Sequence, residues 1–241
     1  EKVLVNQTAG GLDIQPLYAP ASTEPILPVD PHRVAYGWDI RQRHEATSPS
    51  VCQAAVLDDL EHGVTSIELG TPATAWGHDE LRDALEGVLL DIAPVVLAPH
   101  TDLGSARALV DLLDERDDAL TSRCWLGLDP IGAYARSHRL GAVDQVAEFA
   151  ALIADTHPNV VACTIDTTRY VDAGADEVQE IAWMLATGVA MLRSLEAAGL
   201  PVERAAATIG FRVAADADQF LTIARLRAAR SQRWIHCWLV T

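Results

Sequence analysis

The amino-acid sequence predicts an α/β protein built as an incomplete TIM-type (β/α)8 barrel of six to seven strands, preceded by an extended arm. Six stretches with a period of two residues are each followed by a stretch with helical spacing, in strict alternation. No G-x-G-x-x-G pattern follows the first of these strands, where a dinucleotide-binding sheet would carry one. Strict alternation without a break in composition therefore favours a barrel over a doubly wound sheet.

The arm is expected at residues 1–33, because this stretch holds five of the prolines and shows no sustained period: Pro16, Pro20, Pro25, Pro28 and Pro31. Its apolar residues Leu12, Ile14, Leu17 and Tyr18 cannot form a core alone, so we expect them to pack on the barrel or on another subunit.

The barrel domain is expected at residues 34–241, with each strand followed by its helix. The alternation predicts six strands, at 34–41, 65–70, 94–100, 123–129, 160–166 and 205–212. Helical spacing predicts the helices, at 49–62, 79–90, 105–116, 141–156, the stretch after Gly174, and 217–230. A barrel needs eight strands in about 250 residues, and only Trp234 to Val240 remains for a seventh. The chain therefore resembles a piece of a longer protein, truncated at its carboxyl end.

The charge and the cysteine content of the chain limit the kinds of partner and ligand that it can bind. The formal net charge of -16 disfavours nucleic acid and anionic membranes, which both attract positive surfaces. No amino-terminal signal pattern and no long uncharged stretch is present, so we expect a cytoplasmic protein. The four cysteines lack a C-x-x-C pair, which favours reduced, buried thiols over zinc ligands or disulfides: Cys52, Cys124, Cys163 and Cys237.

The two faces of the predicted strands differ in size. One set is small or polar and includes Ser66, Glu68, Gly127, Thr164 and Gly210, whereas the opposite faces carry bulky apolar residues. The bulky faces should pack on the helices, so the small set should point along the barrel axis. Such an axis would be partly open and wide enough for an extended ligand.

Polar side chains end the predicted strands, on the rim where barrel enzymes place their active sites. Candidates for a ligand channel are Asp39, Arg41, Gln42, Ser66, Glu68, His100, Thr164, Asp166, Thr168 and Arg212. No two potential metal ligands share a close spacing, so no metal site is expected. The arginines could instead hold a phosphate or a carboxylate, or form structural salt bridges across the rim.

Several motifs resemble those of the methylmalonyl-CoA mutase family. GLDIQPLYAP at 11–20 resembles the arm motif G-I-x-x-x-P-L-Y, and WDIRQ at 38–42 resembles the first-strand motif W-T-I-R-Q. TIDTTRYVDAGADEVQEIAWMLATGVAMLR at 164–193 and FRVAADADQFLTIARLRAAR at 211–230 are similar to that family too. The resemblance implies a barrel threaded by the pantetheine arm of coenzyme A. It also implies a radical isomerisation of methylmalonyl-CoA and succinyl-CoA in propionate metabolism, with adenosylcobalamin on a separate carboxyl-terminal domain.

Three departures from the catalytic pattern indicate which subunit this chain resembles. Arg43 stands where catalytic chains carry tyrosine, Arg169 where they carry histidine, and Thr208 where they carry arginine. Arginine stays protonated and cannot replace neutral imidazole as an acid and base. The resemblance therefore implies the small, non-catalytic subunit of a heterodimeric mutase, with adenosylcobalamin bound by the large catalytic partner and none by this chain alone.

Two alternatives remain at this point. An active acyl-CoA mutase of different specificity would need Arg43 and Arg169 to contact the acyl carboxylate. An unrelated barrel hydrolase or lyase would use His100, Asp129 and Asp166. The carboxyl end, SQRWIHCWLVT at 231–241, departs from the family pattern, and the sequence shows neither the acyl-CoA specificity nor the stoichiometry.

Overall fold

The computed structural model describes residues 4–19, 38–45, 48–70, 76–99, 101–116, 121–137 and 142–239, with side chains at all of these except 135–137 and 232–239. Across these ranges, six parallel strands form one sheet in the order β3-β4-β5-β6-β7-β8. The strands are β3 (Arg41–His44), β4 (Ser66–Leu69), β5 (Val95–Leu97), β6 (Cys124–Leu128), β7 (Val160–Asp166) and β8 (Ile209–Arg212). Each strand pairs with the next in the chain, as in an incomplete α/β barrel.

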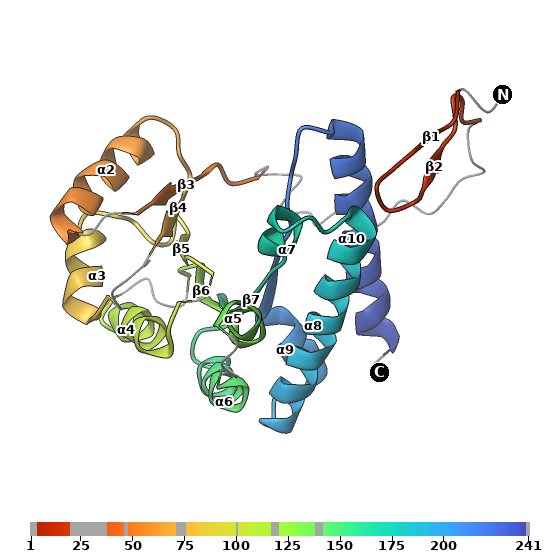
Figure 1. Cartoon of the computed structure of the whole chain (residues 1–241). Coiled ribbons are helices and arrows are strands. Elements are labelled where there is room, and N and C mark those ends of the chain that lie inside the picture. The colour runs from red at the N-terminus through yellow and green to blue at the C-terminus, as the bar shows by residue number, and fades with distance from the viewer. Residues whose placement is uncertain are drawn as a thin grey trace.

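Helices connect successive strands and flank the sheet, with α2 to α4 on one side of the view and α8 and α10 on the other (Figure 1). They are α2 (Pro49–Glu61), α3 (His78–Ala84), α4 (Leu103–Asp114), α5 (Pro130–Ser137), α6 (Val143–Ile153), α7 (Thr168–Asp172), α8 (Glu177–Ala197), α9 (Val202–Ala207) and α10 (Gln219–Leu239). Local sequence sets their starts. The Asp102 side chain accepts a hydrogen bond from the Ser105 amide at the start of α4, and Asp176 accepts from Val178 and Gln179 at the start of α8.

The hydrophobic core lies between the helices and the bulky faces of the strands, as the alternation predicted. Its strand residues are all at least nine-tenths buried: Ile67, Leu69, Val95, Leu97, Cys124, Leu126, Leu128, Cys163, Ile165 and Ile209. Gly188 brings α8 close to β8, since a Cβ there would lie 3.3 Å from the Phe211 ring. The three cysteines with described side chains, Cys52, Cys124 and Cys163, are buried thiols that form no disulfide, as expected for them.

Several predicted boundaries were wrong. The first strand begins at Arg41, since residues 38–40 are irregular and 34–37 lie outside the described residues. Residues 202–207, partly assigned to a strand, form α9, because the alanine-rich run completes a helical turn before β8. Helix α5 lies between the strand predicted at 123–129 and the helix predicted at 141–156, where the sequence pattern predicted no helix. The expected seventh strand is instead the end of α10, which runs on to Leu239, while Val240 lies outside the described residues.

The described part of the expected arm, residues 4–19, forms a hairpin of β1 (Asn6–Gln7) and β2 (Asp13–Ile14). Gly10 at its turn lies close to Asp176 and Val178 at the start of α8. Its larger apolar side chains are not covered, and Leu17 is 85% exposed. Packing of these residues on the barrel is therefore not seen, and the boundary at residues 33 and 34 lies outside the described residues.

Gly127 makes a bulge in β6 that turns the end of this strand. Its φ is +67°, and the pairing register with β7 shifts between Trp125 and Leu128. A Cβ at this position would lie 2.4 Å from the Ala98 carbonyl oxygen, so only glycine fits without moving the backbone.

We predict that Gly127→Ala destabilises the chain by about 2 to 5 kcal/mol, from the left-handed conformation and the backbone clash together. Gly63→Ala is the matched control, because Gly63 has a φ of +103° but an added Cβ would meet nothing within 4 Å. It should lose only about 1 to 2 kcal/mol. Chemical denaturation measures the free energy of unfolding of both variants. Equal losses would show that the clash with the Ala98 carbonyl has no energetic cost.

Candidate functional site

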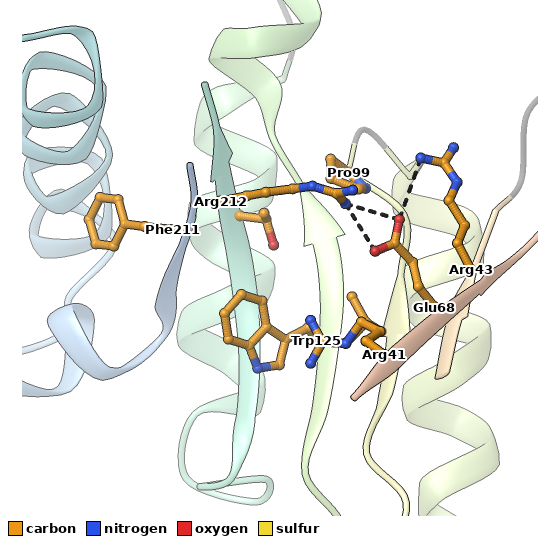
Figure 2. A pocket seen from close by; sticks show the side chains of 9 residues that line it. Arg41, Arg43, Glu68, Pro99, Trp125, Phe211 and Arg212 are labelled. Atoms are coloured by element: carbon orange, nitrogen blue, oxygen red, sulfur yellow. Dashed lines mark hydrogen bonds and ion pairs between the residues drawn. The ribbon is translucent and has the colours of Figure 1, made fainter. Parts of the chain in front are cut away.

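A cavity of about 340 Å³ lies on the inner face of the sheet and extends to its carboxyl edge at Pro99 and Arg212. One position from each of the six strands lines it, with Arg43, Pro99 and Phe211 beside them: Arg41, Glu68, Val96, Trp125, Thr164 and Arg212. Figure 2 shows Arg212 reaching toward Glu68 and Arg43, and Phe211 pointing away toward the helices. The predicted inner face and rim thus meet in one cavity.

Glu68 is the electrostatic centre of this cavity. Its carboxylate oxygens accept hydrogen bonds of 2.9 and 3.0 Å from Nη1 of Arg212, and Oε1 lies 3.5 Å from Nη1 of Arg43. Arg43 also forms an ion pair of 2.6 Å with Glu45. The Glu68 side chain is only 5% exposed, so its contact with Arg212 joins β4 to β8 through a partly buried ion pair.

Arg41 and Trp125 form the lower part of the cavity. Nε of Arg41 donates to Ser66 Oγ at 2.9 Å, and its guanidinium carbon lies 5.6 Å from the centre of the Trp125 ring. Burial lowers the pKa of Arg41 below its ordinary value, while the carboxylates of Glu68 and Asp39 oppose this change. Arginine nevertheless remains a cation at neutral pH.

Trp125 also corrects the expectation of an open axis. A Cβ at Gly210 would lie 2.4 Å from the Trp125 ring, so the indole extends from β6 across the inner face to β8. Small residues on this face therefore make room for a large side chain of the chain itself. The sequence pattern placed Trp125 on the inner face, but the small residues around it predicted an open axis.

The other candidates whose positions the structure describes do not line this cavity. Asp39 and Gln42 are exposed, and Ser66 is buried beside Arg41. Asp166 accepts hydrogen bonds from the amide and hydroxyl of Thr168, so both residues shape the turn into α7. His100 lies outside the described residues. The structure thus brings together four of the ten candidates.

The three substituted positions are separated by the fold. Arg43 lines the cavity, whereas Arg169 is exposed on α7 and is not part of the lining. Thr208 is buried, and its hydroxyl donates to the Ala205 carbonyl at 2.8 Å at the end of α9. These contacts give Arg43 an electrostatic role and Thr208 a structural one.

The buried groups beneath the rim serve structure. Asp129 accepts from the Gly132 amide at 2.8 Å and from the Asp166 amide at 3.4 Å. Burial, with a contribution from Asp129, raises the pKa of Cys163 to about 12, which keeps this thiol protonated and unreactive. No group of three His, Cys, Asp or Glu that could hold a metal ion is found in the described part of the chain.

A buried ion pair, which the sequence reasoning missed, fixes the loop after β8. Arg225 of α10 lies 3.1 Å from the fully buried Glu180 of α8 and also 3.1 Å from Asp216. Glu180 further accepts from the Thr167 hydroxyl and the Ala214 amide, and Thr167 donates to the Arg212 carbonyl. The positions of the charged residues along α8 and α10 do not predict that these two helices contact each other.

We predict that Arg225→Met destabilises the chain by about 3 to 5 kcal/mol, because it leaves the Glu180 carboxylate buried without its cation. Arg82→Met removes an exposed pair with Asp79 and should change the free energy of unfolding by less than about 1 kcal/mol. Denaturant unfolding compares the two, and a small loss for Arg225→Met would show that water reaches Glu180.

Comparison with known proteins finds one family to which this chain is similar. The family model described as "Methylmalonyl-CoA mutase" matches residues 132–237. The "Methylmalonyl-CoA mutase small subunit" of Streptomyces virginiae is 40% identical over 246 residues, which cover 95% of this chain and 40% of that protein. The protein of the same name from Propionibacterium freudenreichii subsp. shermanii is 34% identical, over 95% of this chain and 38% of its own length.

A third relative, the "Probable methylmalonyl-CoA mutase small subunit" of Mycobacterium bovis, is 35% identical over 97% of this chain and 40% of its own. The fold and the cavity define an α/β protein with an incomplete barrel, in which Trp125 of β6 extends across part of the inner face to Gly210 of β8. The chain is similar, over 95% or more of its own length, to small subunits of methylmalonyl-CoA mutases. It spans about two fifths of the length of these small subunits.

Proposed function

We propose that this chain is the barrel part of a non-catalytic small subunit, which supports the large catalytic subunit in interconverting methylmalonyl-CoA and succinyl-CoA. The observation that carries the proposal is the filled axis. Trp125 lies against Gly210, and Glu68 pairs with Arg212 above it, so the path of a threaded pantetheine chain is closed by protein atoms.

The substituted positions support the same function. Arg43 is held by two carboxylates, Arg169 stays outside the cavity, and Thr208 is bonded within its own turn. An active acyl-CoA mutase of different specificity would require Arg43 and Arg169 to meet at one acyl carboxylate, and the fold separates them. Asp129 and Asp166 are engaged in turns, which also disfavours a hydrolase or lyase site.

The described residues do not fit adenosylcobalamin. The cations at the mouth are turned toward Glu68, and a cavity of about 340 Å³ is too small for a corrinoid. In the proposed complex the large partner chain binds the cofactor, which supplies the radical chemistry. Acyl-CoA is likewise a ligand of the partner, and the complex is cytoplasmic. No helix among the described residues is long and apolar enough to span a bilayer.

The hairpin arm supplies a surface for that partner. Leu12, Leu17 and Tyr18 are 53%, 85% and 65% exposed, although they are apolar and follow one another closely. Covering exposed apolar surface with a partner stabilises the complex by about 25 cal/mol of free energy per Å². We infer that the arm packs on the large subunit.

We predict that the 241-residue chain co-purifies with a homologous chain that carries the catalytic tyrosine and histidine. Leu12→Ser with Leu17→Ser should weaken this association about tenfold or more, because it removes apolar contacts. Leu152→Ser is the control, since Leu152 is 70% exposed on α6, away from the arm. Unchanged association of the arm variant, measured by calorimetry, would exclude the arm from the interface.

We also predict that Arg43→Tyr, Arg169→His and Thr208→Arg together produce no mutase activity in this chain alone. Trp125 would still fill the axis, and the radical source would still be absent. An assay for succinyl-CoA with adenosylcobalamin supplied tests this, with the co-purified complex as the positive control. Turnover by the isolated chain would contradict the proposed non-catalytic role.

A further inference from the structure

The cavity contains more positive than negative charge. Three guanidinium groups line it, from Arg41, Arg43 and Arg212, and the lining includes one carboxylate, that of Glu68. Glu68 is shared between Arg212 and Arg43, and Arg43 has a second partner in Glu45. The lining itself therefore carries an excess of positive charge, although Glu45 and Asp39 lie close to two of the arginines and the whole chain carries a formal net charge of -16.

Arg41 is the cation that these carboxylates leave without an ion pair. Among the described residues, no carboxylate lies within ion-pair distance of its guanidinium, whose contacts are the Ser66 hydroxyl and the Trp125 ring. Arg41 is exposed, so its guanidinium can reach an anion from solvent, and this attraction is strongest at low ionic strength, where salt screens it least.

Thr164 provides a second, independent indication of a ligand. It lines the same cavity and is 3% exposed, yet its hydroxyl oxygen has no hydrogen-bond partner among the described residues. An unpaired buried hydroxyl costs about 1 to 3 kcal/mol. Because Thr164 pairs with Gly210 in the sheet, its side chain is held on the inner face beside the cavity.

We propose that this cavity binds one small oxyanion, a carboxylate or a phosphate, with Arg41 supplying the charge and Thr164 donating a hydrogen bond. Arg43 of the same strand and Arg212 of β8 add to the attraction. Glu68 opposes it, because its carboxylate competes with the ligand for the same cations. The inference concerns this chain alone and does not rest on its association with a large subunit.

The shape of the cavity limits the ligand to a small one. Trp125 closes the lower end against Gly210, and the ion pair of Glu68 with Arg212 crosses the upper part. A volume of about 340 Å³ holds a dicarboxylate or inorganic phosphate with its water, whereas a coenzyme A chain would need the axis that Trp125 occupies.

Calorimetric titration of the 241-residue chain with malonate, and separately with inorganic phosphate, tests the proposal at low ionic strength. We expect saturable binding of one anion per chain.

Arg41→Gln should weaken this binding about tenfold or more, and Thr164→Val about threefold or more, because each removes a donor. Glu68→Gln should strengthen it about tenfold, because the competing carboxylate is lost. Tighter binding of malonate assigns a carboxylate ligand, and tighter binding of phosphate assigns a phosphoryl ligand.

Arg82→Gln is the matched control, since it removes the same charge from exposed α3 and should leave the affinity unchanged. Circular dichroism checks the fold of each variant, and Thr164→Val and Glu68→Gln decide the question if Arg41→Gln does not fold. The proposal is overturned if neither anion binds saturably, if Arg82→Gln weakens binding as much as Arg41→Gln, or if Glu68→Gln does not strengthen it.

Discussion

The alternation of side chains along six parallel strands is the constraint on which this structure depends. Because successive residues face opposite sides, one register places Ile67, Leu97 and Ile165 against the helices and directs Glu68, Val96 and Thr164 inward. A shift by one residue would bury the charged set under the helices and expose the apolar set to the axis. The same pairing register of the strands therefore produces both the hydrophobic core and the cavity.

Two ion pairs hold distant elements of this arrangement in place, one between strands and one between helices. Glu68 and Arg212 come from strands that are not neighbours in the sheet, so their contact fixes the curvature of the strands between them. Below the loop that follows Arg212, Arg225 and Glu180 join α10 to α8 inside the protein. Together the two pairs set where the last strand ends and where its side chains point.

The sequence predicted this arrangement where the signal was periodic and failed where a distant neighbour decided. Apolar alternation located five of the six strands, whereas the first was predicted at 34–41 and β3 begins only at Arg41. Four of the predicted inner-face residues, Arg41, Glu68, Thr164 and Arg212, line one cavity. The alanine-rich run at 202–207 has no strong period, so its helix was missed. The position of Trp125 over Gly210 joins residues far apart in the chain, and no local pattern reports how one fills the space left by the other.

The fit of Trp125 against Gly210 also couples the two positions in any substitution. Shortening the indole alone would leave a void on the inner face, and adding any side chain at Gly210 alone would collide with the ring. Each single change therefore costs stability, whereas a smaller residue at 125 together with a larger one at 210 can refill the same space. The free-energy changes of the two substitutions are thus not additive, because each residue occupies the space that the other leaves.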